Sequence, residues 1–87
     1  VSRAMAAQAA DELLNITGFQ ASFVLYPDEE GRVVISARSI GEANVQVILE
    51  ALGGGGNAAT AGAQLKDSTV AEALERLKES IDNYYDN

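Results

Sequence analysis

The sequence predicts a two-layer α/β domain of the α+β type, in which three helices pack on a small sheet that contains a β-hairpin. The chain has 87 residues, a length that suits one domain, so residues 1–87 are expected to fold as a single unit. Segments with helical hydrophobic spacing alternate with segments that resemble strands. The sequence Pro27-Asp28-Glu29-Glu30-Gly31 predicts a turn between two of these strands.

The first half of the chain predicts a helix followed by the hairpin. Ser2 is a candidate N-cap for this helix, and Gly18 follows as a stop signal. Its narrow apolar stripe consists of Ala6, Ala9, Ala10, Leu13 and Leu14. Residues 21–26 and 32–38 are rich in aromatic and β-branched side chains, which predicts two antiparallel strands.

The second half predicts two more helices and a short strand. A helix is indicated by the i, i+3, i+4, i+7 spacing of Val45, Ile48, Leu49 and Leu52. Residues 61–65 are a candidate strand. Thr69 and Glu72 predict a capping box at the start of the last helix, and Tyr84 and Tyr85 either fray at its end or pack back onto the fold. The apolar stripe of this helix consists of Val70, Leu74, Leu77 and Ile81.

Composition excludes several classes of protein. The sequence has no cysteine and no histidine, which removes disulfides, thiolate metal sites and nucleophilic triads. Six basic and thirteen acidic residues give a net charge of −7, which disfavours binding to a long nucleic acid. No apolar segment has the length of a membrane span, and no signal-peptide pattern is present. The chain starts at Val1, so we expect a piece of a larger protein.

Four consecutive glycines, Gly53, Gly54, Gly55 and Gly56, follow the second predicted helix. Each glycine costs about 0.5–1 kcal/mol relative to alanine inside a regular element, so the run indicates a need for bare backbone. One explanation is close approach of main-chain N–H groups to a ligand such as a phosphate. The alternative is a flexible linker.

Arg38 at the end of the second predicted strand is the candidate ligand-binding cation. Its guanidinium suits phosphate, and Ser36 and Ser39 place hydroxyl groups beside it. Alternatively, Arg38 pairs with a carboxylate and Ser39 caps the next helix. The acidic residues 28–30 are interpreted as a solvated hairpin tip rather than a metal site. The residues alone therefore indicate a small acidic domain with one phosphate-binding corner.

Several segments resemble the DHHA1 domain, the C-terminal substrate-binding domain of DHH-family phosphoesterases. They are Val33-Val34-Ile35-Ser36-Ala37-Arg38-Ser39, Asn44-Val45-Gln46-Val47-Ile48, Leu52 with the four glycines, and Ala61-Gly62-Ala63-Gln64-Leu65. The opening Gln8-Ala9-Ala10-Asp11-Glu12-Leu13-Leu14 and the strand Ala21-Ser22-Phe23-Val24-Leu25 are similar to the bacterial membrane-anchored cyclic-di-AMP phosphodiesterases. The resemblance implies a parent hydrolase that converts cyclic-di-AMP to a linear dinucleotide.

The resemblance also implies a division of roles between two domains of the parent. The DHH domain would hold two divalent metal ions, usually manganese, so this fragment would have no metal ligands or catalytic residues and would be inactive alone. Arg38 would bind the phosphate with Ser36 and Ser39 as neighbours, the glycines would supply loop amides, and Ala61 and Gly62 would border the cleft. The implied partners are the cyclic dinucleotide, the DHH domain and a second copy of the chain. A soluble fragment on the cytoplasmic side of an anchored parent is expected.

Asn57 departs from the family pattern, in which the glycines continue into a histidine that faces the active site. Asparagine can donate a hydrogen bond but cannot be protonated to meet the charge of a phosphate. Either the domain is a variant with an altered substrate contact, or a short segment with the histidine is absent from this sequence. We favour the second explanation because Asn57-Ala58-Ala59 resembles the residues downstream of the histidine in the cyclic-di-AMP subfamily.

Two rival functions come from other classes. Related domains in alanyl-tRNA synthetases serve in RNA binding, although the acidic composition counts against that function here. A structural dimerisation module is the second rival, and it would show no affinity for nucleotides.

Overall fold

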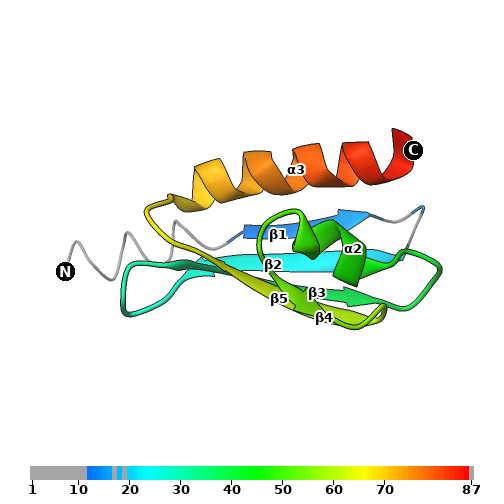
Figure 1. Ribbon diagram of the computed structural model, residues 1–87, viewed down its shortest axis with the longest axis horizontal. Helices are drawn as coiled ribbons and strands as arrows, with labels where there is room; N and C mark the ends of the chain where they lie inside the picture. The colour runs from blue at the N-terminus through cyan, green and yellow to red at the C-terminus, as the bar shows by residue number, and fades with distance from the viewer. Residues whose placement is uncertain (1–11, 17, 19, 87) are drawn as a thin grey trace.

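The computed structural model describes residues 12–16, 18 and 20–86, in which two helices cover one face of a five-stranded antiparallel sheet (Figure 1). The strands are β1 (Glu12–Ile16), β2 (Ala21–Pro27), β3 (Val33–Ser39), β4 (Gly55–Gly56) and β5 (Thr60–Leu65), and the helices are α2 (Val45–Glu50) and α3 (Val70–Asp86). The strands lie in the order β1-β2-β3-β5-β4. The predicted α+β class is confirmed, and the described residues form two helices instead of the three that were expected.

The prediction of a first helix is wrong for Leu13 and Leu14, which lie in strand β1 and pair with β2. The strand separates them onto opposite faces: Leu14 packs against the core, whereas Leu13 is 64% exposed on the other face. Pairing with β2 therefore overrides the helical spacing, as tertiary contacts often do. Ser2, Ala6, Ala9 and Ala10, the rest of the predicted helix, lie outside the described residues.

The predicted hairpin is confirmed, since β2 and β3 are antiparallel neighbours with Tyr26 opposite Val34. Asp28 organises the turn between them. Its Oδ1 accepts hydrogen bonds from the amides of Glu30 and Arg32, and its Oδ2 accepts one from Arg32 Nε, all at 2.9 Å. The turn is the Asx type that aspartate favours.

The core lies between the sheet and the helices. Alternate residues of the central strands point into it, and Phe23, Leu25 and Ile35 are fully buried. Val70, Leu77 and Ile81 of α3 pack against them, as the helical spacing predicts. The predicted capping box begins α3: Thr69 Oγ1 accepts from Glu72 N at 3.0 Å, and Glu72 Oε1 accepts from Thr69 N at 2.9 Å.

Two polar contacts join α3 to α2. The buried Ser80 hydroxyl donates to the carbonyl of Ile48 at 2.6 Å, and the amide of Asn44 donates to the hydroxyl of Tyr84 at 3.0 Å. Asn44 also caps α2, because its Oδ1 accepts from Val47 N. Of the two predicted outcomes for Tyr84, packing back onto the fold is therefore confirmed. These contacts fix α2, and with it the start of the glycine segment.

Candidate functional site

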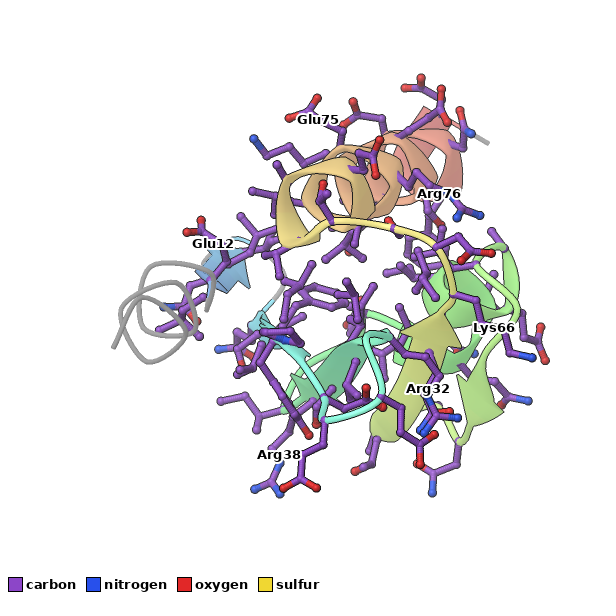
Figure 2. All side chains as sticks on the ribbon, turned by 90° about the vertical axis from the view of Figure 1, so that its left-hand side faces the viewer. Glu12, Arg32, Arg38, Lys66, Glu75 and Arg76 are labelled. Atoms are coloured by element: carbon purple, nitrogen blue, oxygen red, sulfur yellow. The ribbon has the colours of Figure 1, made fainter. Side chains whose placement is uncertain are left out.

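The sheet face opposite the helices is open and nearly uncharged. Residues that alternate with the core positions point to this face, among them Ser22, Ser36, Thr60 and Gln64. Arg38 is the only charged side chain among the described strand residues of this face. Figure 2 shows Arg38 projecting on the side of the sheet away from α3. A single guanidinium on an uncharged face is suited to one phosphate rather than to a polyanion.

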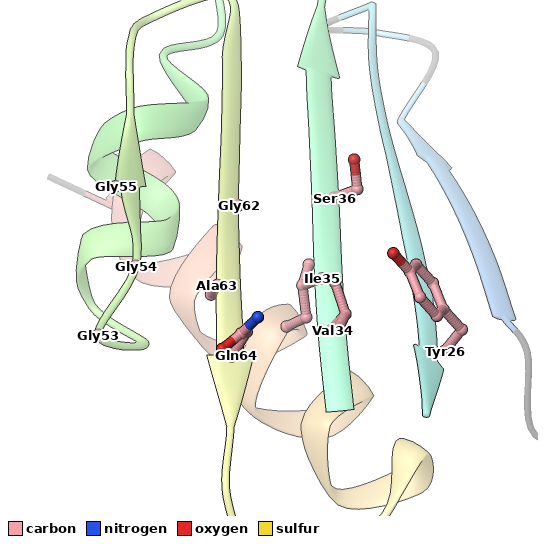
Figure 3. Close-up of a pocket in the computed structure, with 10 residues that line it drawn as sticks. All are labelled: Tyr26, Val34, Ile35, Ser36, Gly53, Gly54, Gly55, Gly62, Ala63 and Gln64. Carbon is pink, nitrogen blue, oxygen red and sulfur yellow. The ribbon is translucent and has the colours of Figure 1, made fainter. Parts of the chain in front are cut away.

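A depression of about 580 Å³ lies on this face beside the glycine segment (Figure 3). Gly62 and Gly55, which are opposite each other in the β4–β5 pair, are among its lining residues. Its other lining residues are Tyr26, Val34, Ile35, Ser36, Gly53, Gly54, Ala63 and Gln64. The depression therefore brings together one of the predicted serines, three of the four glycines and Gly62.

Three of the four glycines are required by the fold itself. Gly53 has φ +85° and ends α2, with its amide donating to the carbonyl of Glu50 at 3.1 Å. The amide of Gly54 donates to the carbonyl of Leu49 at 2.8 Å, which completes a Schellman-type ending. A Cβ on Gly54 would overlap the Gly62 carbonyl oxygen and lie 2.6 Å from Ala63 Cβ. Gly56 has φ +146°, and a Cβ there would lie 2.6 Å from Ala61 Cα.

Gly55 and Gly62 have no such structural requirement. A Cβ on Gly55 would meet no heavy atom within 4 Å, and one on Gly62 would meet the Ile35 carbonyl oxygen at 3.4 Å, an ordinary contact. Neither residue has a positive φ. Both added methyl groups would project into the depression, because opposite residues of a strand pair point to the same face. The bare surface at this pair is therefore available for a ligand.

Arg38 lies two positions along β3 from Ser36, which places the two Cα atoms about 7 Å apart. In the part of the chain that the structure describes, Arg38 forms no ion pair or hydrogen bond, so the alternative pairing with a carboxylate is not observed. It borders a second, more apolar depression with Asn15, Ser22 and Ile40. Arg38 is thus exposed and, among the described residues, unpaired, and it lines the second depression while its neighbour Ser36 lines the first.

The remaining predicted site residues lie elsewhere. Ser39 is buried on the covered face, where its hydroxyl exchanges hydrogen bonds with the backbone of Gly41. The side chain of Ala61 is also in the core. Asn57 is exposed, and its Oδ1 accepts from the amides of Ala59 and Thr60 at 3.0 and 2.9 Å within its own turn. Contacts of Ser39, Ala61 and Asn57 with a ligand stay predictions.

The sequence reasoning did not identify Tyr26 and Gln64, which lie on either side of Val34 in one row across the sheet. Period-two alternation contains the signal for both. Phe23 and Leu25 point into the core, so Tyr26, the residue after Leu25, points to the open face. Ala63 and Leu65 likewise place Gln64 on the open face.

Among residues 12–16, 18 and 20–86, no three His, Cys, Asp or Glu side chains come together as a metal site. No helix in the described part of the chain is long and apolar enough to cross a membrane. The groups that could contact a ligand are thus one guanidinium, hydroxyl and amide side chains, one aromatic ring and bare backbone. This set can bind and orient a phosphate ester.

A two-layer α+β domain with one helix-covered face and one open sheet face is the class of protein that this structure defines. The family model of the DHHA1 domain matches residues 1–87, so the chain belongs to the DHHA1 domain family.

Three named proteins are similar to this chain over most of its length. A cyclic-di-AMP phosphodiesterase, GdpP, from Bacillus subtilis (strain 168) is 54% identical over 80 residues, which are 92% of this chain and 12% of that protein. The cyclic-di-AMP phosphodiesterase PdeA from Listeria monocytogenes is 53% identical over 81 residues, 93% of this chain and 12% of that protein. A membrane protein–large ribosomal subunit bL9 fusion protein from Aster yellows witches'-broom phytoplasma is 34% identical over 85 residues, 98% of this chain and 10% of that protein. The chain thus spans about an eighth of the phosphodiesterases that it matches.

Proposed function

We propose that this chain is the substrate-binding domain of a metal-dependent DHH/DHHA1 phosphodiesterase that hydrolyses cyclic-di-AMP to a linear dinucleotide. The observation that carries the proposal is identity above 50% to named cyclic-di-AMP phosphodiesterases over more than nine-tenths of the chain. Among the described residues, Arg38 has no ion-pair partner and is the one charged strand side chain on the open sheet face, which supports the proposal independently.

In this proposal Arg38 binds and orients a phosphodiester group. A charge-assisted hydrogen bond from a guanidinium to phosphate is about twice as strong as a neutral one and fixes the geometry when it is bidentate. The exposed hydroxyl of Ser36 donates a further hydrogen bond beside it. The segment Gly53–Gly56 borders the same site, and two of its amides, those of Gly53 and Gly54, already end α2.

The hydrolytic step belongs to the rest of the parent protein. Divalent metal ions, manganese in this proposal, would be held by the DHH domain and would lower the pKa of a bound water. The described residues of this chain hold the phosphate against that centre. We also propose that the DHH domain lies in the same chain and that the parent is anchored in the bacterial membrane with this domain on its cytoplasmic side.

The test is Arg38→Ala in the full-length protein, with cyclic-di-AMP hydrolysis measured in the presence of Mn²⁺. Loss of a charged hydrogen bond costs about 1.5–3 kcal/mol, so kcat/KM should fall by roughly 10- to 150-fold. Arg76→Ala is a matched control, because Arg76 is an exposed arginine on α3 at the covered side of the sheet, and its kcat/KM should stay within about twofold of wild type.

The site itself can be located by titrating the domain with cyclic-di-AMP and with the linear dinucleotide while backbone amide shifts are recorded. Shifts should centre on residues 53–56 and on Arg38, and they should disappear in Arg38→Ala. Equal losses of activity in the Arg38 and Arg76 variants, or shifts confined to α3, would contradict the proposal.

A further inference from the structure

We propose that the depression over Gly55 and Gly62 is an adenine-binding subsite, in which Tyr26 stacks on the base and Gln64 recognises its edge. This inference rests on the proposed function, and it adds the residues that select the base. Three features of the open face support it: the floor without side chains at Gly55 and Gly62, the exposed ring of Tyr26 and the amide of Gln64.

The floor of the depression carries no side chain at Gly55 and Gly62. Gly55 and Gly62 are adjacent across the β4–β5 pair, and each would accept a Cβ without a clash. Glycine in a strand interior weakens the strand and often marks a close approach by a ligand. Neither backbone geometry nor packing requires glycine at these two positions. We therefore attribute both glycines to the need to keep side chains out of the depression.

The wall is the ring of Tyr26, which is 38% exposed at the edge of the depression (Figure 3). In the described part of the molecule, its hydroxyl has no hydrogen-bond partner and its ring has no aromatic neighbour. An exposed aromatic ring beside a nucleotide site is a platform on which a base can stack.

Gln64 supplies the hydrogen-bonding groups. Its amide has both donors and an acceptor, and in the structure, as far as it is described, these have no partner. A glutamine amide can bind adenine with two hydrogen bonds, to the N6 amino group and N7. Figure 3 shows Tyr26 and Gln64 extending from the strands on either side of β3, so a base over Val34, with Gly62 as a diagonal neighbour, lies between them.

The position of Arg38 agrees with this arrangement. Ser36 lies between Val34 and Arg38 on the same face of β3, so the ring and the guanidinium lie toward opposite ends of the face. A nucleotide with its base at Tyr26 therefore directs its phosphate toward Ser36 and Arg38.

The test uses the full-length protein and two substrates, cyclic-di-AMP and cyclic-di-UMP, whose smaller ring stacks less and lacks the N6 and N7 groups. Tyr26→Leu and Gly62→Ala should each raise the KM for cyclic-di-AMP by about tenfold with little change in kcat. The value of kcat/KM for cyclic-di-UMP should change by less than about threefold, so the preference for adenine shrinks. Tyr26→Phe is the matched control, because it keeps the ring, and its KM should stay within about twofold of wild type.

Three outcomes overturn some part of the argument. Equal losses with both substrates would show that this face packs against the DHH domain instead of a base. An unchanged substrate preference in Tyr26→Leu would overturn the adenine subsite and leave the proposed function intact. A wild-type protein that hydrolyses no cyclic-di-AMP would overturn the proposed function itself. Thermal unfolding of each variant gives the folded fraction, and Tyr26→Leu decides the case if Gly62→Ala fails to fold.

Discussion

At the scale of single residues, the neighbouring glycines Gly54 and Gly55 have opposite roles. Gly54→Ala should lower the free energy of unfolding by about 3 kcal/mol, because the new methyl group overlaps the backbone of Gly62 and Ala63. Gly55→Ala should change it by less than about 1 kcal/mol, since its methyl group meets no atom within 4 Å. Urea unfolding of the two variants measures the difference. Equal destabilisation would show that Gly55 is also required by the fold.

The sequence could predict that bare backbone is needed at 53–56 but not which glycine serves which purpose. Positive φ at Gly53 follows from its place after α2, which local sequence indicates. The close contacts of Gly54 and Gly56 arise from β5, which lies later in the chain, so they depend on tertiary structure. Arg38, Ser36 and Ser39 were all predicted as site residues because they lie near the end of a strand. In the structure, the alternation of side chains along β3 places Ser39 on the covered face.

The carboxylate of Asp28 is a second residue with a measurable effect. Burial raises its pKa, but the hydrogen bonds from Arg32 and Glu30 and the charge of Arg32 lower it more, so the pKa of Asp28 lies below 3.8. Because the pKa is lower in the folded protein, the ionised form stabilises the fold. This contribution is complete above the unfolded pKa and is lost as the pH falls from about 3.8 through the folded value.

Asp28→Asn should therefore be less stable than wild type at neutral pH, and the difference should shrink below about pH 3.8. Urea unfolding between pH 2 and pH 7 measures it. Glu29→Gln is the matched control, since Glu29 is the next residue of the same turn and forms no ion pair among the described side chains. A difference between Asp28→Asn and wild type that does not change with pH would contradict this role of the carboxylate.

At the scale of elements, α3 fixes the position of α2 through Ser80 and Tyr84. Ser80→Ala should destabilise the domain by about 1–2 kcal/mol, because it removes a buried hydrogen bond to the Ile48 carbonyl. Tyr84→Phe should cost about 1 kcal/mol by leaving the Asn44 amide without its partner. Denaturant unfolding checks both values. Thr69→Ala, which removes the cap of α3 and leaves these contacts in place, should cost about 1 kcal/mol.

Ser80→Ala and Tyr84→Phe also test whether α2 positions the glycine segment Gly53–Gly56. Because α2 ends in Gly53 and Gly54, loosening its contact with α3 should raise the KM for cyclic-di-AMP in the full-length protein. Thr69→Ala lies at the far end of α3 and should leave KM unchanged. A rise in KM for all three variants would indicate a general loss of stability instead.

Elements with strong local signals were predicted correctly, and the candidate strand at residues 61–65 is confirmed as β5, whereas β1 and β4 were not predicted. The β2–β3 hairpin has its own turn residues, and α3 has its own capping box. Strand β1 carries two adjacent leucines that fit a helix equally well, and pairing with β2 decides between the two structures. Strand β4 consists of two glycines, which have no strand propensity, so nothing in the sequence indicates that this segment pairs with β5.

At the scale of the whole molecule, the acidic helix α3 and the proposed ligand site are on different sides of the sheet. Helix α3 on the covered side carries five acidic and two basic residues, whereas Arg38 is the charged group of the described open-face strand positions. A dianionic dinucleotide therefore meets long-range repulsion from a net charge of −7 and short-range attraction from one guanidinium. These two effects respond differently to salt.

The long-range repulsion is the more easily screened of the two. With an average separation of roughly 15 Å in a molecule 20–23 Å thick, repulsion amounts to about 2 kcal/mol at 10 mM salt and less than about 1 kcal/mol at 150 mM. Attraction to Arg38 at about 4 Å falls by only roughly a third over the same range. Affinity should therefore rise severalfold as salt is added, which is the opposite of the salt response of a nucleic-acid-binding domain.

Amide-shift titrations of the 87-residue chain with cyclic-di-AMP, a dianion, at 10 and 150 mM NaCl measure this effect. Arg38→Gln should weaken binding at both salt concentrations and steepen the increase with salt, because it removes the attraction and keeps the repulsion. Affinity that falls as salt is added would indicate a positive surface large enough to contact several phosphates. That result would favour the rival hypothesis of RNA binding over a cyclic-dinucleotide site at Arg38, because only a polyanion engages many cations at once.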